Sequence, residues 1–111
     1  MNLLEQISQA PNTIVFSEVI AYIDANFTFT PTRFTNGNTV NEAGQNNGSC
    51  KIFSFAKLQN LTPSEMLSLF GDYYRKDVLK NPEGSDHQNI RNFMETGWEG
   101  IEFEGEALKE K

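Results

Sequence analysis

The first 26 residues contain two stretches in which apolar side chains recur at helical spacing. The first predicts a short helix over residues 2–9, which Pro11 ends. The second has the i, i+3, i+4, i+7 pattern of an amphipathic helix and predicts a helix over residues 17–26, with Ser17 as its N-cap. The apolar residues that make up the two patterns are Leu3, Leu4 and Ile7, then Phe16, Val19, Ile20 and Ile23.

After the second helix the pattern changes to that of strands and turns. Residues 27–30 alternate Phe and Thr, which are both common in strands. Pro31 cannot donate to a sheet ladder, so this segment is expected to be an edge strand or two short pieces. Asn36-Gly37 lies between two β-favouring segments and predicts a hairpin with a type I′ turn, because both residues tolerate positive φ.

The Asn- and Gly-rich segment over residues 41–48 predicts a loop, in which two glycines let the backbone turn freely. From Ser49 onwards the apolar spacing favours a helix. A strand through Phe53 and Phe55 is the alternative interpretation of the same residues.

Two further helix starts have the pattern of capping boxes. Thr62-Pro63-Ser64-Glu65 places a capping hydroxyl, a proline at the first helical position and a glutamate three residues after the cap. Ser85-Asp86-His87-Gln88 repeats the pattern. Gly71 is expected to break the helix that follows the first box, and Gly97 is expected to end the helix that follows the second.

Together these elements predict one α+β domain over residues 1–111, with about five or six helices packed with a small antiparallel sheet. Nine Phe, three Tyr and one Trp are enough to bury a core in a chain of 111 residues. Ile101 and Phe103 belong to a short strand pattern near the C-terminus. The polar tail over residues 105–111 is expected to fray.

The net charge of −6 argues against two classes of partner. Residues 92–111 hold six Glu and two Lys, and the chain has no basic stripe. We therefore expect no binding to nucleic acid or to anionic membranes, because both depend on clustered basic side chains. The single cysteine fits a reducing compartment, and the sequence shows neither a signal peptide nor a membrane span, so we expect a soluble cytoplasmic protein.

Five blocks of the sequence form a combination that is specific as a set. They are Phe29–Phe34, Asn36-Gly37, Asn41–Phe53, Leu69–Arg75 and Asp86–Met94. In this combination the chain resembles the HopJ type III effector family, over about residues 16–103. The resemblance implies a small bacterial protein, with no established catalytic residues, that a type III system secretes into a host cell.

The N-terminus differs from what such secretion leads one to expect. Type III export signals tend to be flexible and rich in serine, whereas residues 2–9 predict a helix and Ser8 is the one serine among the first sixteen residues. Export is therefore an expectation that rests on the family resemblance.

Cys50 and His87 are the one cysteine and the one histidine of the chain, and both lie at predicted helix starts. Helix N-terminal amides and the charge of Lys51 lower a thiol pKa, while Asp86, Glu42 or an Asn would orient the imidazole. Such a site would suit acyl transfer, namely amide hydrolysis, deamidation or transglutamination. The alternative is a cysteine that packs as a small hydrophobe and a half-buried histidine on the core-facing stripe.

The Asn- and Gly-rich segment is a candidate site for an anion or a small ligand, because backbone amides ahead of a helix can cradle a phosphate or a carboxylate. Its spacing does not match a P-loop. The alternative is a loop whose Asn side chains satisfy their own backbone. The candidate binding residues here are Asn36, Asn41, Gly44, Asn46, Gly48, Ser49 and Lys51.

Tyr74 and Arg75, with Arg91 from another helix, are candidates for a surface that recognises a protein partner, since Tyr and Arg are common interface anchors. The alternative is that the tyrosines pack in the core and the arginines form surface ion pairs. We expect no metal and no cofactor, because one His and one Cys fall short of a usual zinc set.

We rank a binding or interaction module first, a cysteine-dependent acyl-transfer enzyme second and a small-ligand binder third. We also predict that residues 34–53 wrap against the helix that starts near Ser85, which would bring Cys50 and His87 into one neighbourhood. The oligomeric state is left open by the sequence.

Overall fold

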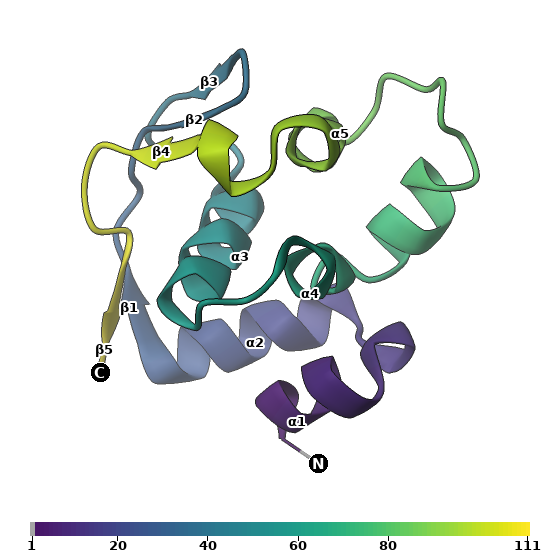
Figure 1. Ribbon diagram of the computed structural model, residues 1–111. Helices are drawn as coiled ribbons and strands as arrows, with labels where there is room; N and C mark the ends of the chain where they lie inside the picture. The colour runs from purple at the N-terminus through teal and green to yellow at the C-terminus, as the bar shows by residue number, and fades with distance from the viewer. Residues whose placement is uncertain (1) are drawn as a thin grey trace.

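The computed structural model describes residues 2–111 and has the expected α+β architecture. Its helical part consists of five α-helices, one π-helix and two short 3-10 helices over these residues (Figure 1). None of these helices has both the length and the apolar character needed to cross a bilayer. The α-helices are α1 (Leu3–Gln9), α2 (Phe16–Asn26), α3 (Asn47–Leu58), α4 (Pro63–Ser68) and α5 (Gln88–Thr96); the others are η1 (Pro11–Thr13), the π-helix η2 (Tyr73–Val78) and η3 (Gly97–Gly100).

The strands form two small antiparallel sheets, where the sequence had led us to expect one. The first has the order β3-β2-β4, and the second consists of β1 and β5. Both lie on the same side of the molecule in Figure 1, next to α3. Their bounds are β1 (Phe27–Phe29), β2 (Phe34–Asn36), β3 (Thr39–Asn41), β4 (Ile101–Phe103) and β5 (Leu108–Glu110).

The hairpin between β2 and β3 is confirmed, but its turn differs from the expected type. Asn36 pairs with Thr39, so Gly37 and Asn38 form the two-residue loop. Gly37 has φ +61°, while Asn38 is not among the residues with positive φ. A glycine with positive φ at the first central position is typical of a type II′ turn. Asn36 is thereby free to serve as a buried strand residue instead of a turn residue.

The C-terminal tail was expected to fray, but the structure places it in a strand. Leu108 pairs with Phe29 in the β1–β5 ladder, and the amide of Thr30 donates to the carbonyl of Ala107 at 2.8 Å. Ala107 and Leu108 are both buried. This polar segment is ordered because its two adjacent apolar residues, flanked by Glu106 and Lys109, cover the otherwise open edge of β1.

The helix starts follow the sequence in one case and depart from it in two. The capping box at Thr62 and Glu65 is present in full. Helix α2 starts one residue early, with Val15 as its N-cap instead of Ser17, because the ring of Phe16 packs against other aromatic rings. Helix α5 starts after His87 instead of Ser85.

The expected break at Gly71 is confirmed, and its cause is a close approach of two backbones. Gly71 has φ +60°, and a Cβ atom there would lie 3.0 Å from the amide nitrogen of Phe16 and 3.1 Å from the carbonyl oxygen of Ile14. Glycine is the residue that fits both constraints. The chain continues into the π-helix η2, a type that is rare and often marks a functional site.

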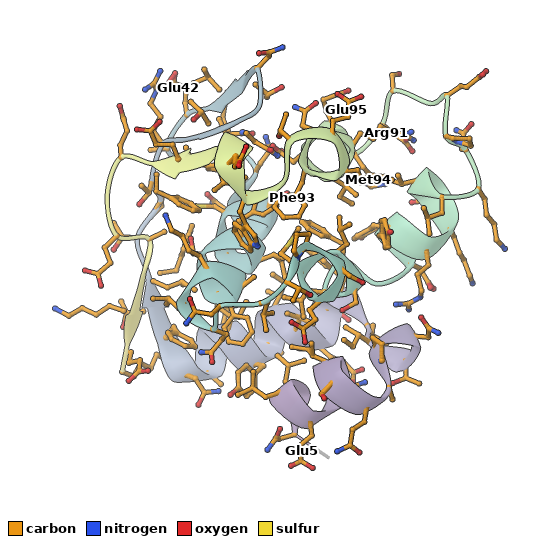
Figure 2. All side chains as sticks on the ribbon, viewed as in Figure 1. Glu5, Glu42, Arg91, Phe93, Met94 and Glu95 are labelled. Atoms are coloured by element: carbon orange, nitrogen blue, oxygen red, sulfur yellow. The ribbon has the colours of Figure 1, made fainter. Side chains whose placement is uncertain are left out.

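Helix α3 is the centre of the core, and the strand alternative for its residues is wrong. Phe53 lies on it, fully buried, with its ring centroid 5.5–5.9 Å from those of Phe34, Phe70 and Phe93. Figure 2 shows Phe93 pointing from α5 into this core, while Glu95 points away from it. These ring contacts therefore join α3, the turn after α4, α5 and the three-stranded sheet, and this packing sets the distance between the starts of α3 and α5.

Candidate functional site

Two helix starts with unusual backbone geometry lie at the candidate site. Asn46, the N-cap of α3, has φ 51° and ψ 47°, and His87, the N-cap of α5, has φ 50° and ψ 50°. The left-handed region is uncommon for residues other than glycine, although Asn and His enter it more readily than most. Neither side chain caps its own helix. Both are therefore available for contacts with other segments.

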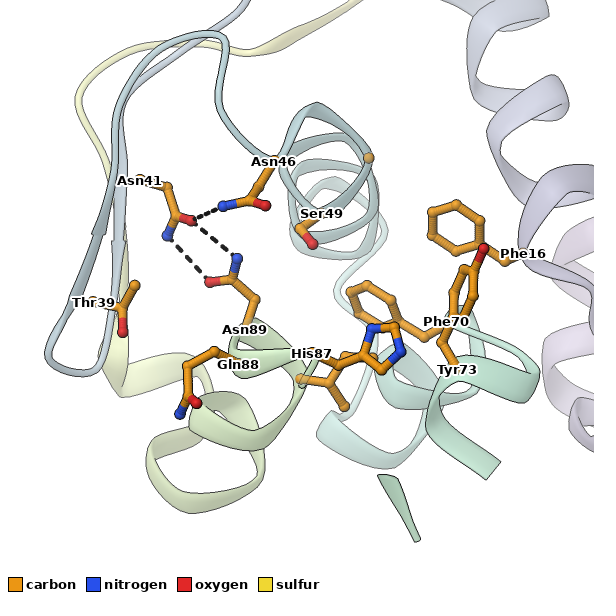
Figure 3. A pocket seen from close by; sticks show the side chains of 12 residues that line it. Phe16, Thr39, Asn41, Asn46, Ser49, Phe70, Tyr73, His87, Gln88 and Asn89 are labelled. Carbon is orange, nitrogen blue, oxygen red and sulfur yellow. Dashed lines mark hydrogen bonds between the residues drawn. The ribbon is translucent and has the colours of Figure 1, made fainter. Parts of the chain in front are cut away.

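A network of Asn side chains, of which Asn36, Asn41 and Asn89 are buried, connects the two helix starts. The amides of Asn41 and Asn89 pair reciprocally: Asn41 Nδ2 donates to Asn89 Oδ1 at 3.1 Å, and Asn89 Nδ2 donates to Asn41 Oδ1 at 3.0 Å. Asn46 Nδ2 donates to the same Asn41 oxygen at 2.6 Å (Figure 3). Asn36 Nδ2 donates to Asn89, to its carbonyl oxygen at 2.8 Å and to Oδ1 at 3.1 Å. The network thus holds β2, β3 and the loop before α3 against α5.

Beside this network lies a pocket of about 380 Å³. One side is polar, with Asn41, Asn46, Asn89 and Ser49. The opposite side is aromatic, formed by Phe16, Phe70, Tyr73 and the imidazole of His87 (Figure 3). Concave sites that combine apolar walls with a few oriented polar groups are typical of ligand binding.

His87 lines the pocket and also belongs to a small charged group. Its Nε2 atom lies 3.0 Å from Asp77 Oδ2 and 3.9 Å from Asp86 Oδ2, and its ring centroid lies 5.0 Å from that of Tyr73. Asp86 is in turn bound by Arg91. The hydrogen bond from the Arg91 guanidinium is the main reason that the pKa of the Asp86 carboxyl lies below its ordinary value.

The predicted contact of residues 34–53 with α5 is confirmed by the bonds from Asn36 and Asn41 to Asn89, but Cys50 is not among the residues that line the pocket with His87. Several of the residues selected from the sequence therefore gather around one pocket. These are Asn41, Asn46, Gly48, Ser49 and His87, with Asn36 in the network beside them.

Other selected residues lie elsewhere and have structural contacts there. Gly44 occupies an open loop with φ +92°. Lys51 forms an ion pair with Asp24 at 2.8 Å. Tyr74 packs against the core and is partly buried.

The two arginines that the sequence suggested for a recognition surface bind backbone carbonyls and a carboxylate of the chain itself. Arg75 donates to the carbonyl of Ile14 at 2.8 Å and pairs with Asp72. Arg91 donates to the carbonyls of Asn81 at 3.0 Å and Asp86 at 2.6 Å, so it ties the loop before α5 to the helix. Their donors are therefore occupied within the chain.

The residues that sequence reasoning missed are those whose position depends on the fold. Phe16, Phe70 and Asn89 line the pocket, and Asp77 contacts His87 from a different helix. A signal for Asn89 was present in the sequence: it lies four residues before Phe93, on the apolar side of its helix, where a polar residue needs a buried partner.

Cys50 does not reach the pocket that His87 lines. Its side chain is 1% exposed, and its Sγ lies 3.7 Å from the carbonyl oxygen of Thr32. Burial is the main cause of a thiol pKa above the ordinary value, which disfavours the nucleophilic thiolate. These contacts match the interpretation of Cys50 as a core residue better than its interpretation as a nucleophile.

We expect the folded protein to react with iodoacetamide at least about a hundredfold more slowly than the urea-unfolded chain, because the buried thiol must be exposed by opening first. Reaction of the native protein at the rate of a free thiol would contradict this placement.

The free energy of unfolding should also fall as the pH rises above about 8.5, since the unfolded thiol then loses its proton while the folded thiol, with its raised pKa, keeps it. The Cys50→Ala variant should lack this part of the pH dependence, which urea unfolding between pH 7 and pH 10 measures.

Comparison with known proteins identifies relatives of this chain. The family model for "HopJ type III effector protein" matches residues 1–108. A solved structure described as "Crystal structure of unknown function protein VPA0580" is similar over 100% of this chain and 95% of its own, with 54% sequence identity and a TM-score of 0.97. No curated protein matches the chain. Because the family model covers nearly the whole sequence, the chain belongs to the HopJ type III effector protein family.

Proposed function

We propose that this type III effector-like protein acts by binding and not by catalysis, and that its pocket takes a polar side chain of a partner protein. The observation that carries the proposal is the pocket itself, in which amide groups face an aromatic wall. We further propose that the partner belongs to a host cell that receives the protein, which follows from the family's description as effectors.

The size of the pocket favours a small group as its occupant. A volume of about 380 Å³ is near the lower end of ligand pockets, which span roughly 300–1,000 Å³. It suits one or two side chains better than a nucleotide cofactor. A net charge of −6 also makes a nucleic acid an unfavourable partner.

The chemistry of the walls favours a planar polar group. A carboxamide has two donor hydrogens and two acceptor lone pairs, so Asn46 and Asn89 keep hydrogen-bonding capacity beyond their bonds to Asn41. Tyr73 and Phe70 offer flat apolar surfaces on the other side. A Gln side chain can satisfy the amides and lie against the rings at the same time.

The known contacts of the reactive side chains support binding over catalysis. His87 Nε2 is within hydrogen-bond distance of Asp77, while Cys50 is buried against Thr32. A nucleophile needs a base within hydrogen-bond reach, and the pair suggested by the sequence lacks that contact.

A titration followed by amide NMR tests the proposal, with N-acetyl-glutamine amide as the probe and EDTA in the buffer. We expect saturable, millimolar-range shifts at Gly48, Ser49 and Asn89, and much weaker shifts with N-acetyl-glycine amide, which has no side chain. Ser49→Phe fills the pocket and should abolish the shifts.

Ser64→Phe is the matched control, because Ser64 is an exposed serine in the first turn of α4 and is not part of the pocket. It should leave the titration unchanged. The absence of shifts in the wild-type protein, or shifts that persist in Ser49→Phe, would overturn the assignment of the pocket.

A further inference from the structure

The fold brings together three metal-ligating side chains from two segments of the chain. Asp77 comes from the π-helix η2, and Asp86 and His87 come from the loop that leads into α5. One ligand atom from each lies within 4.8 Å of the other two. The distances from His87 Nε2 are 3.0 Å to Asp77 Oδ2 and 3.9 Å to Asp86 Oδ2. Ligands bound at about 2.0–2.2 Å around one ion are separated by distances of this order.

Asp77 and His87 are each held in position by a different feature of the fold. In η2 the amide of Leu79 donates to the carbonyl of Tyr74, five residues back, and this wider helical turn contains Asp77. His87 takes its direction from a left-handed backbone and from the ring of Tyr73, 5.0 Å away between centroids.

Asp86 is held by Arg91 in a way that leaves one oxygen free. The guanidinium binds Asp86 Oδ1 at 2.5 Å and also the Asp86 carbonyl oxygen, at 2.6 Å from Nε. The other carboxylate oxygen, Oδ2, is the one on the side of His87. Carboxylate ligands of metals are commonly oriented by such hydrogen bonds from outside the coordination shell.

We infer that Asp77, Asp86 and His87 form a binding site for a divalent transition-metal ion, of which Zn²⁺ is the best match. One imidazole and two carboxylates are a donor set that zinc accepts, and the imidazole disfavours Mg²⁺ and Ca²⁺, which prefer oxygen ligands. The sequence had led us to expect no metal because one His and one Cys fall short of a usual zinc set. The packing of η2 against α5 adds Asp77 to Asp86 and His87.

The site would be at the rim of the pocket, since His87 belongs to both. Three protein ligands leave a coordination position open to water or to an oxygen of a bound group. The inference is independent of the proposed function, because metal binding is measured on the protein without any other ligand.

Isothermal titration of tag-free, EDTA-treated protein with ZnCl₂ tests the site. We expect one saturable site per chain, and a higher melting temperature in the presence of Zn²⁺. Asp77→Asn and His87→Asn should each weaken binding by at least about tenfold. Asn tolerates the left-handed backbone at position 87, so this variant removes the ligand without straining the fold.

Asp72→Asn is the matched control, because Asp72 is an exposed carboxylate next to η2 that pairs with Arg75 and Lys76 and does not belong to the group of three. Its affinity for Zn²⁺ should equal that of the wild type. Circular dichroism checks that every variant is folded. No saturable binding, or binding that Asp77→Asn and His87→Asn leave unchanged, would overturn the inference.

Discussion

Replacing Asn89 by alanine is expected to lower the free energy of unfolding by about 3–5 kcal/mol. The Asn89 side chain accepts from Asn36 and Asn41 and donates to Asn41. All three residues are buried, so the substitution leaves polar groups of Asn36 and Asn41 without partners away from water. Each such group costs about 1–3 kcal/mol, which makes the loss larger than that of one hydrogen bond.

Urea unfolding followed by the fluorescence of Trp98 measures this loss, because that indole packs edge-on against Phe93 of the same core, with ring centroids 5.1 Å apart. Gln88→Ala is the control. Gln88 is the exposed neighbour of Asn89 on α5 and makes one side-chain hydrogen bond, to Asn92. Its effect should stay within about 0.5 kcal/mol. A loss below about 1 kcal/mol for Asn89→Ala would mean that the network contributes little to the stability of the fold.

Phe53→Ala is expected to cost a similar 3–5 kcal/mol, for an apolar reason. The ring of Phe53 is fully buried and packs against the rings of Phe34, Phe70 and Phe93. Its removal takes apolar surface out of the core and leaves a cavity among the three neighbouring rings. The same unfolding experiment measures the loss.

Leu58→Ala provides the comparison on the same helix. Leu58 is 50% exposed at the C-terminal end of α3, so its truncation should change stability by no more than about 0.5 kcal/mol. Equal losses at the two positions would contradict the placement of the core on the Phe53 side of α3.

The two large effects differ in what they imply for the pocket. Phe53 does not line it, whereas Asn89 is part of its polar wall. Asn89→Ala is therefore expected to impair both stability and binding of the amide probe. Phe53→Ala should act on stability alone where the variant remains folded. If Asn89→Ala weakens binding of the amide probe by more than its unfolded fraction explains, the loss comes from the polar wall of the pocket.

Much of the fold could be predicted from the sequence because its signals are local. The capping box at Thr62 and the end of a helix at Gly97 are set by hydrogen bonds within a few residues. Helices α2 and α3 follow from the period of their apolar residues. The alternation of Phe and Thr likewise predicted β1.

One mistaken prediction depends on a contact that is distant in the sequence, and another depends on a side chain from the next helical turn. Strand β5 exists because Leu108 reaches Phe29 across most of the chain length. The start of α5 is displaced from Ser85 because Arg91 takes the oxygens of Asp86, so that His87 becomes the N-cap. The capping pattern of Ser85 to Gln88 does not include Arg91, so it could not predict that Arg91 would bind the oxygens of Asp86.

The α+β class, most of the helices, the hairpin and the family could be predicted from the residues alone, because they depend on local backbone preferences and on motifs that are linear patterns. The residues also pointed to the segment around Asn41 and Ser49 as the place to look for a site. The folded structure was needed to show which side chains share a pocket, that Cys50 is buried against Thr32, and that Asp77 joins Asp86 and His87. These neighbours are brought together by the packing of α3, α5 and η2 around the aromatic core, and the direction of each side chain depends on all of these elements at once.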